Sequence, residues 1–195
     1  MQISCRDRNK IALQSDILGA NALGIKNILC ITGDSVKAGD QPDSKAVHQF
    51  ESVRLLQQIQ AFNKGIDPTF GELPDKKTYI FAGAAADPSC KNQRSLENRI
   101  RKKKEAGAQF IQTQMVMEKE NLIKFCEKIS NPLEIPVIAG VFLLKSYKNA
   151  IFINKYVPGA NIPESILNRL KDAKDPLKEG IQIAAEQAHD FFNIA

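Results

Sequence analysis

The stretch "ALGIKNILCITGD", residues 22–34, decides the fold of this chain. Gly24 stands where a helix would end, and the run from Asn27 to Thr32 has the length and apolar character of a buried strand. A second stretch, "EAGAQFIQTQ" at residues 105–114, repeats the order of helix end, glycine and strand. Such tight returns from a helix into a strand predict α/β architecture.

Three further apolar runs of strand length accompany these two. The expected strands are therefore residues 2–5, 27–32, 78–85, 109–114 and 135–141. Most of these runs lack strict alternation with polar residues, which is typical of parallel strands covered on both faces. The sequence predicts a parallel sheet.

Helical spacing of apolar residues predicts helices between these strands. The expected helices cover residues 9–23, 47–63, 95–106 and 119–130. Residues 161–192 have the pattern of two amphipathic helices divided near Asp175 and Pro176, which we expect to pack on the outside as scaffold.

Two kinds of α/β sheet compete for this pattern, the open doubly wound sheet and the closed barrel. The chain contains neither G-x-G-x-x-G nor the G-K-[ST] ending of a P-loop, so both common phosphate loops are absent. Polar residues instead follow the expected strands at their carboxyl ends, namely Asp34, Asp87, Gln112 and Gln114. Barrel enzymes place their chemistry at that end, so the sequence favours a barrel.

Composition limits the class of protein. A chain of 195 residues with 43% hydrophobic and 25% charged residues is typical of a globular protein. No run is long enough for a membrane helix, and the start "MQISCRDRNK" lacks an apolar stretch of signal-peptide length, so we expect a cytoplasmic location and no membrane partner. The four cysteines lie far apart without a C-x-x-C pair, so we expect reduced thiols and no metal site.

The net charge of +5 is concentrated in one basic run, "RIRKKKE" at residues 99–105. This run could be a solvated helix face, or it could bind a small ligand that carries phosphate. Nucleic acid is the least favoured partner, because no aromatic residues are interleaved with the basic ones.

Local patterns leave the polar strand ends open to two interpretations. Gly-Asp after a strand is common in turns, so Gly33 and Asp34 could form a turn rather than a site. Phe110, Gln112 and Gln114 alternate onto one face of their strand. The two amides, expected to be buried, need either neighbouring side chains or a ligand as partners, because an unpaired buried amide costs about 1 to 3 kcal/mol.

Four longer stretches resemble one known family. They are "SCRDRNKIALQSDILGANALGIKNILCITGD", "FAGAAADP", "KKKEAGAQFIQTQ" and "IAGVFLLKSYKNAIFINKYVPGANIP". Together and in this order they resemble methylenetetrahydrofolate reductase, in the form sometimes fused to a homocysteine methyltransferase. The resemblance implies an incomplete (β/α)8 TIM barrel, about strands 3 to 7 with their helices, in a single FAD-binding domain over residues 1–195.

The resemblance also implies an activity. In this family NADH or NADPH reduces FAD, and the reduced flavin passes hydride to 5,10-methylenetetrahydrofolate to give 5-methyltetrahydrofolate, in one-carbon metabolism toward methionine. The family's general-acid glutamate belongs to the first strand, which we expect to be missing together with the second and the last. The chain alone should then be a poor folate reductase, and a non-catalytic remnant or subunit, which binds flavin or a barrel-completing partner, stays open as the alternative. A homo-oligomer or a methyltransferase fusion partner is also possible by resemblance.

Site residues carry over one position at a time. Asp34 is the catalytic candidate, because an anionic side chain beside flavin and folate can stabilise the cationic iminium that opens from the methylene bridge. Departures from the family pattern are Gln2 where histidine is more usual, Asp87 where relatives have histidine or asparagine, and Asn149 where many have glutamine. The residues implied to contact FAD are Gln2, Thr32, Gly33, Asp34, Ala46, Asp87, Arg99, Lys102 and Lys103, and those implied to contact substrate are Gln114 and Asn149.

Overall fold

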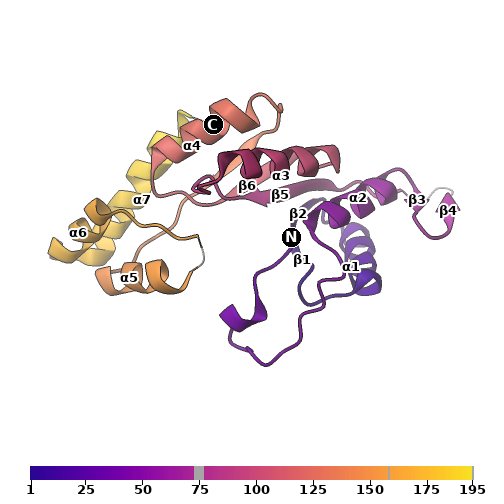
Figure 1. The fold of residues 1–195 in the computed structure, drawn as a ribbon, viewed down its shortest axis with the longest axis horizontal. Helices are drawn as coiled ribbons and strands as arrows, with labels where there is room; N and C mark the ends of the chain where they lie inside the picture. The colour runs from indigo at the N-terminus through magenta and orange to yellow at the C-terminus, as the bar shows by residue number, and fades with distance from the viewer. Residues whose placement is uncertain (73–76, 158, 195) are drawn as a thin grey trace. The chain divides into compact units, whose positions relative to one another are not determined.

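The computed structural model describes residues 1–72, 77–157 and 159–194 (Figure 1). Its strands are β1 Gln2–Ser4, β2 Asn27–Ile31, β3 Ile66–Asp67, β4 Gly71–Glu72, β5 Phe81–Ala86, β6 Phe110–Met115 and β7 Val137–Gly140. Its α-helices are α1 Lys10–Ala22, α2 Ser52–Asn63, α3 Gln93–Glu105, α4 Lys119–Phe125, α5 Tyr147–Tyr156, α6 Glu164–Asp172 and α7 Pro176–Phe192. A short 3-10 helix, Val36–Ala38, and a π-helical turn, Cys126–Ser130, complete the described elements.

The main sheet has five strands in the order β1-β2-β5-β6-β7. Strand β2 pairs in parallel with both β1 and β5, with Leu29 opposite Gln2 on one side and opposite Gly83 on the other. The order in space follows the order in the chain without the reversal that marks a doubly wound sheet. The predicted α/β class with a parallel sheet is therefore confirmed, in the order expected for part of a (β/α)8 barrel.

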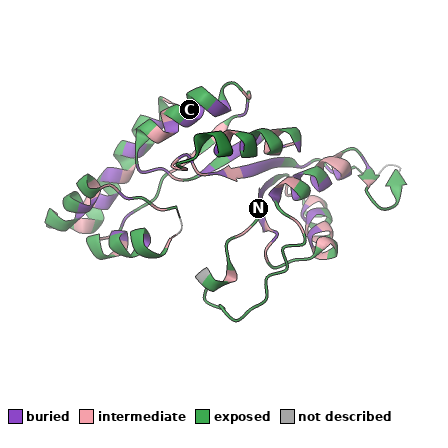
Figure 2. Cartoon of the chain, viewed as in Figure 1, coloured by how far each residue is buried: buried purple, intermediate pink, exposed green. Residues whose placement is uncertain are grey.

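The chain divides into two compact units. Unit 1 comprises residues 1–85 and 98–111, and unit 2 comprises residues 86–97 and the chain from residue 112 onward. In unit 1 the fully buried residues of α1 and α2 include Leu13, Ile17, Leu55 and Ile59. Figure 2 colours the buried parts of these two helices purple. Helix α2 packs on α1 and on β2, so these side chains form the core beneath the sheet.

Unit 2 has its own core, formed where α5, α6 and α7 pack together. Helix α4 also packs against α7. Arg169 joins α6 to α7, because its guanidinium lies 2.7 Å from Glu179 and 2.7 Å from Glu186, both on α7. The buried residues of this cluster are Met117, Leu144, Ala150, Ile153, Ile162, Leu167, Leu170 and Ile183.

The glycines that were expected to end helices do so. Gly24 and Gly107 follow α1 and α3 with φ values of 77° and 104°, a conformation that side chains with a Cβ rarely adopt. The amide of Ala108 then donates to the carbonyl of Lys103, and Phe110 opens β6 directly afterwards. The tight return predicted from "EAGAQFIQTQ" is confirmed.

The helix expected over residues 47–63 begins only at Ser52, so its predicted start is wrong. His48 has a φ of 41°, which is incompatible with a helix. The amides of Val47 and His48 donate to the Arg6 carbonyl, and Gln49 Oε1 accepts from the amide of Lys10 at 2.7 Å. Hydrogen bonds to the chain that follows β1 therefore keep the segment before α2 out of the helix.

Helix α5 was not predicted from the sequence. Its start is specified by Ser146, whose side chain accepts a hydrogen bond from the amide of Asn149 at 3.1 Å. The helix expected at 119–130 is confirmed, although its last turn, Cys126–Ser130, is π-helical. Among the described residues no helix combines the length and the apolar character needed to cross a membrane.

All four cysteines are free thiols, and burial raises the pKa of three of them, Cys5, Cys30 and Cys126, which should make the protein sensitive to alkali. Burial raises the pKa of Cys5 to about 11, with Glu51 adding to the effect, and raises that of Cys30 to about 12, with Cys5 adding to it. Above about pH 9 an unfolded chain loses these protons while the folded chain keeps them. The free energy of unfolding must therefore fall as pH rises from about 9 through about 12.

We predict that the alkaline loss of stability is smaller in Cys30→Ala than in the unchanged protein. The difference between the two should reach on the order of 2 kcal/mol by about pH 11, after subtraction of the pH-independent cost of the cavity. Urea unfolding in the presence of a reductant, followed at several pH values, measures it. Cys90→Ala is the matched control and should keep the full alkaline loss, since Cys90 is only half-buried. Parallel curves for the protein and Cys30→Ala would contradict the prediction.

Candidate functional site at the carboxyl ends of the strands

Thr32 follows β2 and connects that strand to the start of α2. Its Oγ1 accepts a hydrogen bond from the amide of Ser52 at 3.1 Å and lies 3.4 Å from the Ser52 hydroxyl. Glu51, at the N-cap position of α2, makes no capping hydrogen bond with its side chain. Thr32 therefore supplies a cap to α2 from outside the helix, and this holds the end of β2 in place.

We expect Thr32→Val to lower the free energy of unfolding by about 1 kcal/mol, because the first amide of α2 loses its acceptor. Thr32→Ser keeps the hydroxyl and should retain most of the stability. Thermal unfolding of both variants by circular dichroism measures the difference. A larger loss in Thr32→Ser than in Thr32→Val would contradict this and show that the methyl group, and not the hydroxyl, stabilises the junction.

Gly33 has a φ of 91° and lies against the segment that follows β1. A Cβ atom at this position would overlap Ser4 Oγ and come within 2.7 Å of Arg6 Cβ. Both the backbone conformation and the close approach thus require glycine. The consequence is that the chain after β2 passes directly over the end of β1.

Arg6 lies at the centre of this arrangement. Its carbonyl accepts from the amide of Val47 at 2.7 Å, which fastens the exposed loop that carries Ala46. Its guanidinium lies 2.7 Å from Asp7, and this pair raises the pKa of Arg6, with smaller contributions from Asp34 and Asp40. Sequence reasoning did not single out Arg6, although it lies within the stretch that carries the resemblance.

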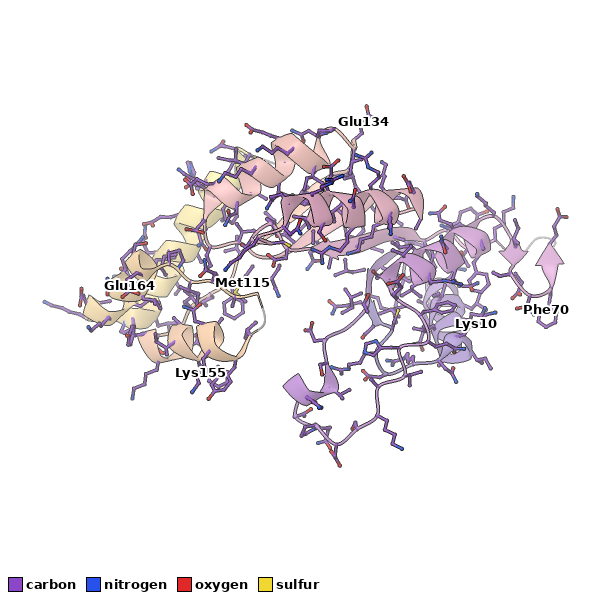
Figure 3. All side chains as sticks on the ribbon, viewed as in Figure 1. Lys10, Phe70, Met115, Glu134, Lys155 and Glu164 are labelled. Carbon is purple, nitrogen blue, oxygen red and sulfur yellow. The ribbon has the colours of Figure 1, made fainter. Side chains whose placement is uncertain are left out.

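Of the predicted residues of β1 and β2, Gly33 and Asp34 lie beside Arg6, whereas Gln2 lies at the start of β1 and pairs with Leu29. The side chain of Asp34 is exposed and lies close enough to Arg6 to act on its charge. Gln2 is exposed on β1 and lies on the same side of that strand as Ser4, which contacts Gly33. Lys10, labelled in Figure 3, is the first residue of α1, and its amide donates to Gln49 in the segment before α2.

Helix α3 carries the three predicted basic residues, Arg99, Lys102 and Lys103, and they differ in how far they are exposed. Lys103 Nζ donates to the carbonyl oxygen of Ala85 at 2.7 Å, near the carboxyl end of β5. Burial lowers the pKa of Lys103, the positive charge of Arg99 lowers it further, and Glu51 acts in the opposite direction. Arg99 and Lys102 are exposed. Of the three predicted basic residues, Lys103 is therefore the one that is turned inward to the strand ends.

Asp87 lies in unit 2, immediately after β5. Its Oδ1 accepts from the amide of Ser89 at 2.9 Å, and its Oδ2 lies 3.2 Å from the position that a Cβ of Gly159 would occupy. The carboxylate therefore both closes a turn and lies against the loop that follows α5.

Gln114 and Gln112 are exposed, so the prediction that these amides are buried is wrong. Residues of β6 alternate as expected, but Ile111 and Thr113 occupy the buried side. The Thr113 hydroxyl accepts from the Gly140 amide at 2.9 Å and donates to the Gln114 carbonyl at 2.7 Å. Gln114 Oε1 accepts from the amide of Met115 at 3.1 Å, and Met115 marks the end of β6 in Figure 3.

Asn149 takes part in the cap of α5. Its Oδ1 accepts from the amide of Lys145 at 3.2 Å, while its own amide donates to Ser146. The amide oxygen of Asn149 therefore accepts a hydrogen bond within the turn that begins α5.

Charged and polar side chains gathered at the carboxyl ends of parallel strands are typical of α/β barrel enzymes. The family model described as methylenetetrahydrofolate reductase matches residues 1–193, so the chain belongs to this family. The resemblance inferred from the sequence is confirmed.

Curated relatives have the same family name. Methylenetetrahydrofolate reductase 2 of Schizosaccharomyces pombe is 28% identical over 190 residues, which cover 89% of this chain and 27% of that protein. The probable methylenetetrahydrofolate reductase (NADPH) of Caenorhabditis elegans is 24% identical over 181 residues, which cover 89% of this chain and 24% of the relative. The chain thus spans about a quarter of the length of these relatives.

Proposed function

We propose that this chain carries the flavin-binding and folate-binding part of a methylenetetrahydrofolate reductase. NADPH or NADH would reduce FAD, and the reduced flavin would pass hydride to 5,10-methylenetetrahydrofolate, giving 5-methyltetrahydrofolate. The observation that carries the proposal is the family match over residues 1–193, which includes every residue implied by the resemblance. The name of the nematode relative specifies NADPH, which favours that nucleotide here.

The basic residues of α3 fit the diphosphate of FAD. Arg99 and Lys103 are four residues apart on one helix, so their side chains are neighbours. The lowered pKa of Lys103 means that its positive charge is poorly stabilised by the protein alone. A diphosphate would supply the missing negative charge, and ammonium and guanidinium groups are suited to bind it. The isoalloxazine ring of FAD, when bound, supplies the hydride-transfer chemistry.

Asp34 is the residue of this chain that we propose to act on the folate. Its carboxylate is exposed, and Arg6 lies close enough to offset part of its charge. A carboxylate at this position would stabilise positive charge on the pterin as the methylene bridge opens. Gln114 and Asn149 each use the amide oxygen locally, so we propose that their amide nitrogens donate to the substrate.

The proposal is tested by a single turnover without oxygen. The chain is loaded with FAD, reduced with NADPH, and mixed with 5,10-methylenetetrahydrofolate, and 5-methyltetrahydrofolate is measured by mass spectrometry. A slow reaction is sufficient, since the question is which molecule accepts the hydride. We expect product from the unchanged chain and at least about tenfold slower formation in Asp34→Asn. Asp43→Asn, in the exposed loop before Ala46, is the control and should react like the unchanged chain. Reduced flavin that is reoxidised no faster with folate than without it would overturn the proposal.

The cytoplasmic location, the single-domain organisation, and a homo-oligomer or methyltransferase fusion stay predictions.

A further inference from the structure

Helix α7 carries apolar residues on two sides, one buried and one exposed. Its buried residues are Gly180, Ile183, Gln187 and Phe191, and Ile183 belongs to the core of unit 2. The other apolar residues recur at helical spacing, so they form a second row along the helix. The members of this row, which we call the α7 stripe, are Leu177, Ile181, Ala184, Ala185, Ala188 and Phe192.

The α7 stripe is open to solvent although its largest residues are apolar. Leu177 is 47% exposed, Ile181 54% and Phe192 84%. The alanines between them are exposed or half-buried, and Figure 2 colours the exposed parts of α7 green. Exposed apolar residues that are contiguous on one helix mark a surface for contact with another molecule.

The order of residues in the α7 stripe identifies the partner that fits it. Leu177 and Phe192 are equally far along the chain from the midpoint of the two central alanines. Ile181 and Ala188 are also equally far from that midpoint. Two antiparallel copies of α7 therefore place Leu177 of one on Phe192 of the other, and the small central residues let the helix axes approach to about 8 Å. Self-complementarity of this kind is what a contact across a twofold axis requires.

The charges on α7 also suit an antiparallel pair. Lys178 is exposed beside the stripe near the start of α7, where the positive end of its own helix disfavours a cation. In the pair, Lys178 lies next to the last turn of the other helix, whose carbonyl groups carry negative charge. Glu179 and Glu186 lie against Arg169 of α6, so their charges are directed away from the stripe.

We propose that α7 binds α7 of a second copy of this chain as an antiparallel pair, with the two α7 stripes in contact. One pair of helices is a small interface, so the dimer is weak, with a dissociation constant of about 10 to 100 µM. The proposal uses none of the residues assigned to flavin and folate, and it does not depend on the proposed function.

Sedimentation equilibrium of the full chain, between about 5 and 500 µM, tests the dimer. We expect association that stops at two copies. Ile181→Glu places a charge in the stripe and should raise the dissociation constant at least about tenfold. Gln182→Glu adds the same charge at the next exposed position, outside the stripe, and should change the constant less than about twofold. A chain that stays monomeric at the highest concentration, a dimer that Ile181→Glu leaves unchanged, or assembly beyond two copies would overturn the proposal.

Cysteine cross-linking tests the antiparallel direction. Ala185 lies beside the midpoint of the stripe, so the two copies of this position come within disulfide distance. The two copies of Leu177 lie about 20 Å apart along an antiparallel pair and meet only in a parallel one. With Cys90→Ser as the background, Ala185→Cys should form a disulfide-linked dimer in glutathione disulfide at least about tenfold faster than Leu177→Cys. Equal rates, or a faster reaction of Leu177→Cys, would contradict the antiparallel pair.

Discussion

Gly180→Ala is expected to lower the free energy of unfolding by about 3 kcal/mol, the largest loss that we predict for any single methyl group in this chain. Gly180 lies buried in α7, where that helix crosses the segment between β7 and α5. A Cβ atom there would overlap the carbonyl oxygen of Leu144 and lie 3.0 Å from its carbonyl carbon. Since the obstacle is backbone and not a flexible side chain, α7 itself would have to move away.

Gly19→Ala in α1 is the matched control for this prediction. Gly19 is also inside a helix, but apart from its chain neighbours and the backbone of α1, no atom of the described residues lies within 4 Å of the position that its Cβ would take. The better helix propensity of alanine should then raise the free energy of unfolding by about 0.5 to 1 kcal/mol. Urea unfolding followed by circular dichroism measures both variants. Changes of the same sign at the two positions would show that α7 does not pack against Leu144 in this way.

Lys103→Met is expected to weaken FAD binding by about 10-fold to 100-fold, because a charge-assisted hydrogen bond contributes about 1.5 to 3 kcal/mol. Lys103 is the basic residue of α3 that reaches the strand ends, where it donates to Ala85. Fluorescence titration of FAD measures the dissociation constant. Lys124→Met, on the exposed side of α4, removes the same charge from the protein and should leave the constant unchanged.

The pH dependence of FAD binding separates Lys103 from a general effect of charge. The pKa of Lys103 is lowered in the folded protein, so this side chain loses its proton at lower pH than an exposed lysine does. FAD affinity should then decline as pH rises toward the normal lysine pKa, and Lys103→Met should show no such decline. An unchanged dissociation constant in Lys103→Met, or the same pH profile in both proteins, would remove Lys103 from the flavin site.

The parts of the fold that could be predicted from the sequence are those with local causes. Gly24 and Gly107 end helices because of a backbone conformation that glycine adopts without strain, so "ALGIKNILCITGD" and "EAGAQFIQTQ" were informative by themselves. Residues 47–51 were misassigned because distant partners, the Arg6 carbonyl and the Lys10 amide, decide their course. The start of α5 could have been predicted, since Ser146 is a good N-cap residue.

In the candidate site, too, features with local causes could be predicted and features decided by distant contacts could not. The apolar run predicted that Thr32, Gly33 and Asp34 directly follow a strand, and β2 does end at Ile31. Their roles in binding and catalysis stay predictions. Burial is not local, so the sequence did not show that Gln112 and Gln114 are exposed. The inward orientation of Lys103 could have been predicted. Lys103 follows the buried Leu96 and Ile100 at helical spacing, which places it near the inward side of α3.

We propose that the carboxyl ends of these strands bind FAD, and titration of the full chain with FAD is the decisive measurement. We expect saturable binding of one FAD per chain, with the flavin retained through gel filtration and its visible absorbance bleached by NADPH in the absence of oxygen. Gel filtration that separates all of the flavin from a chain that is still folded would show that these strand ends do not bind FAD.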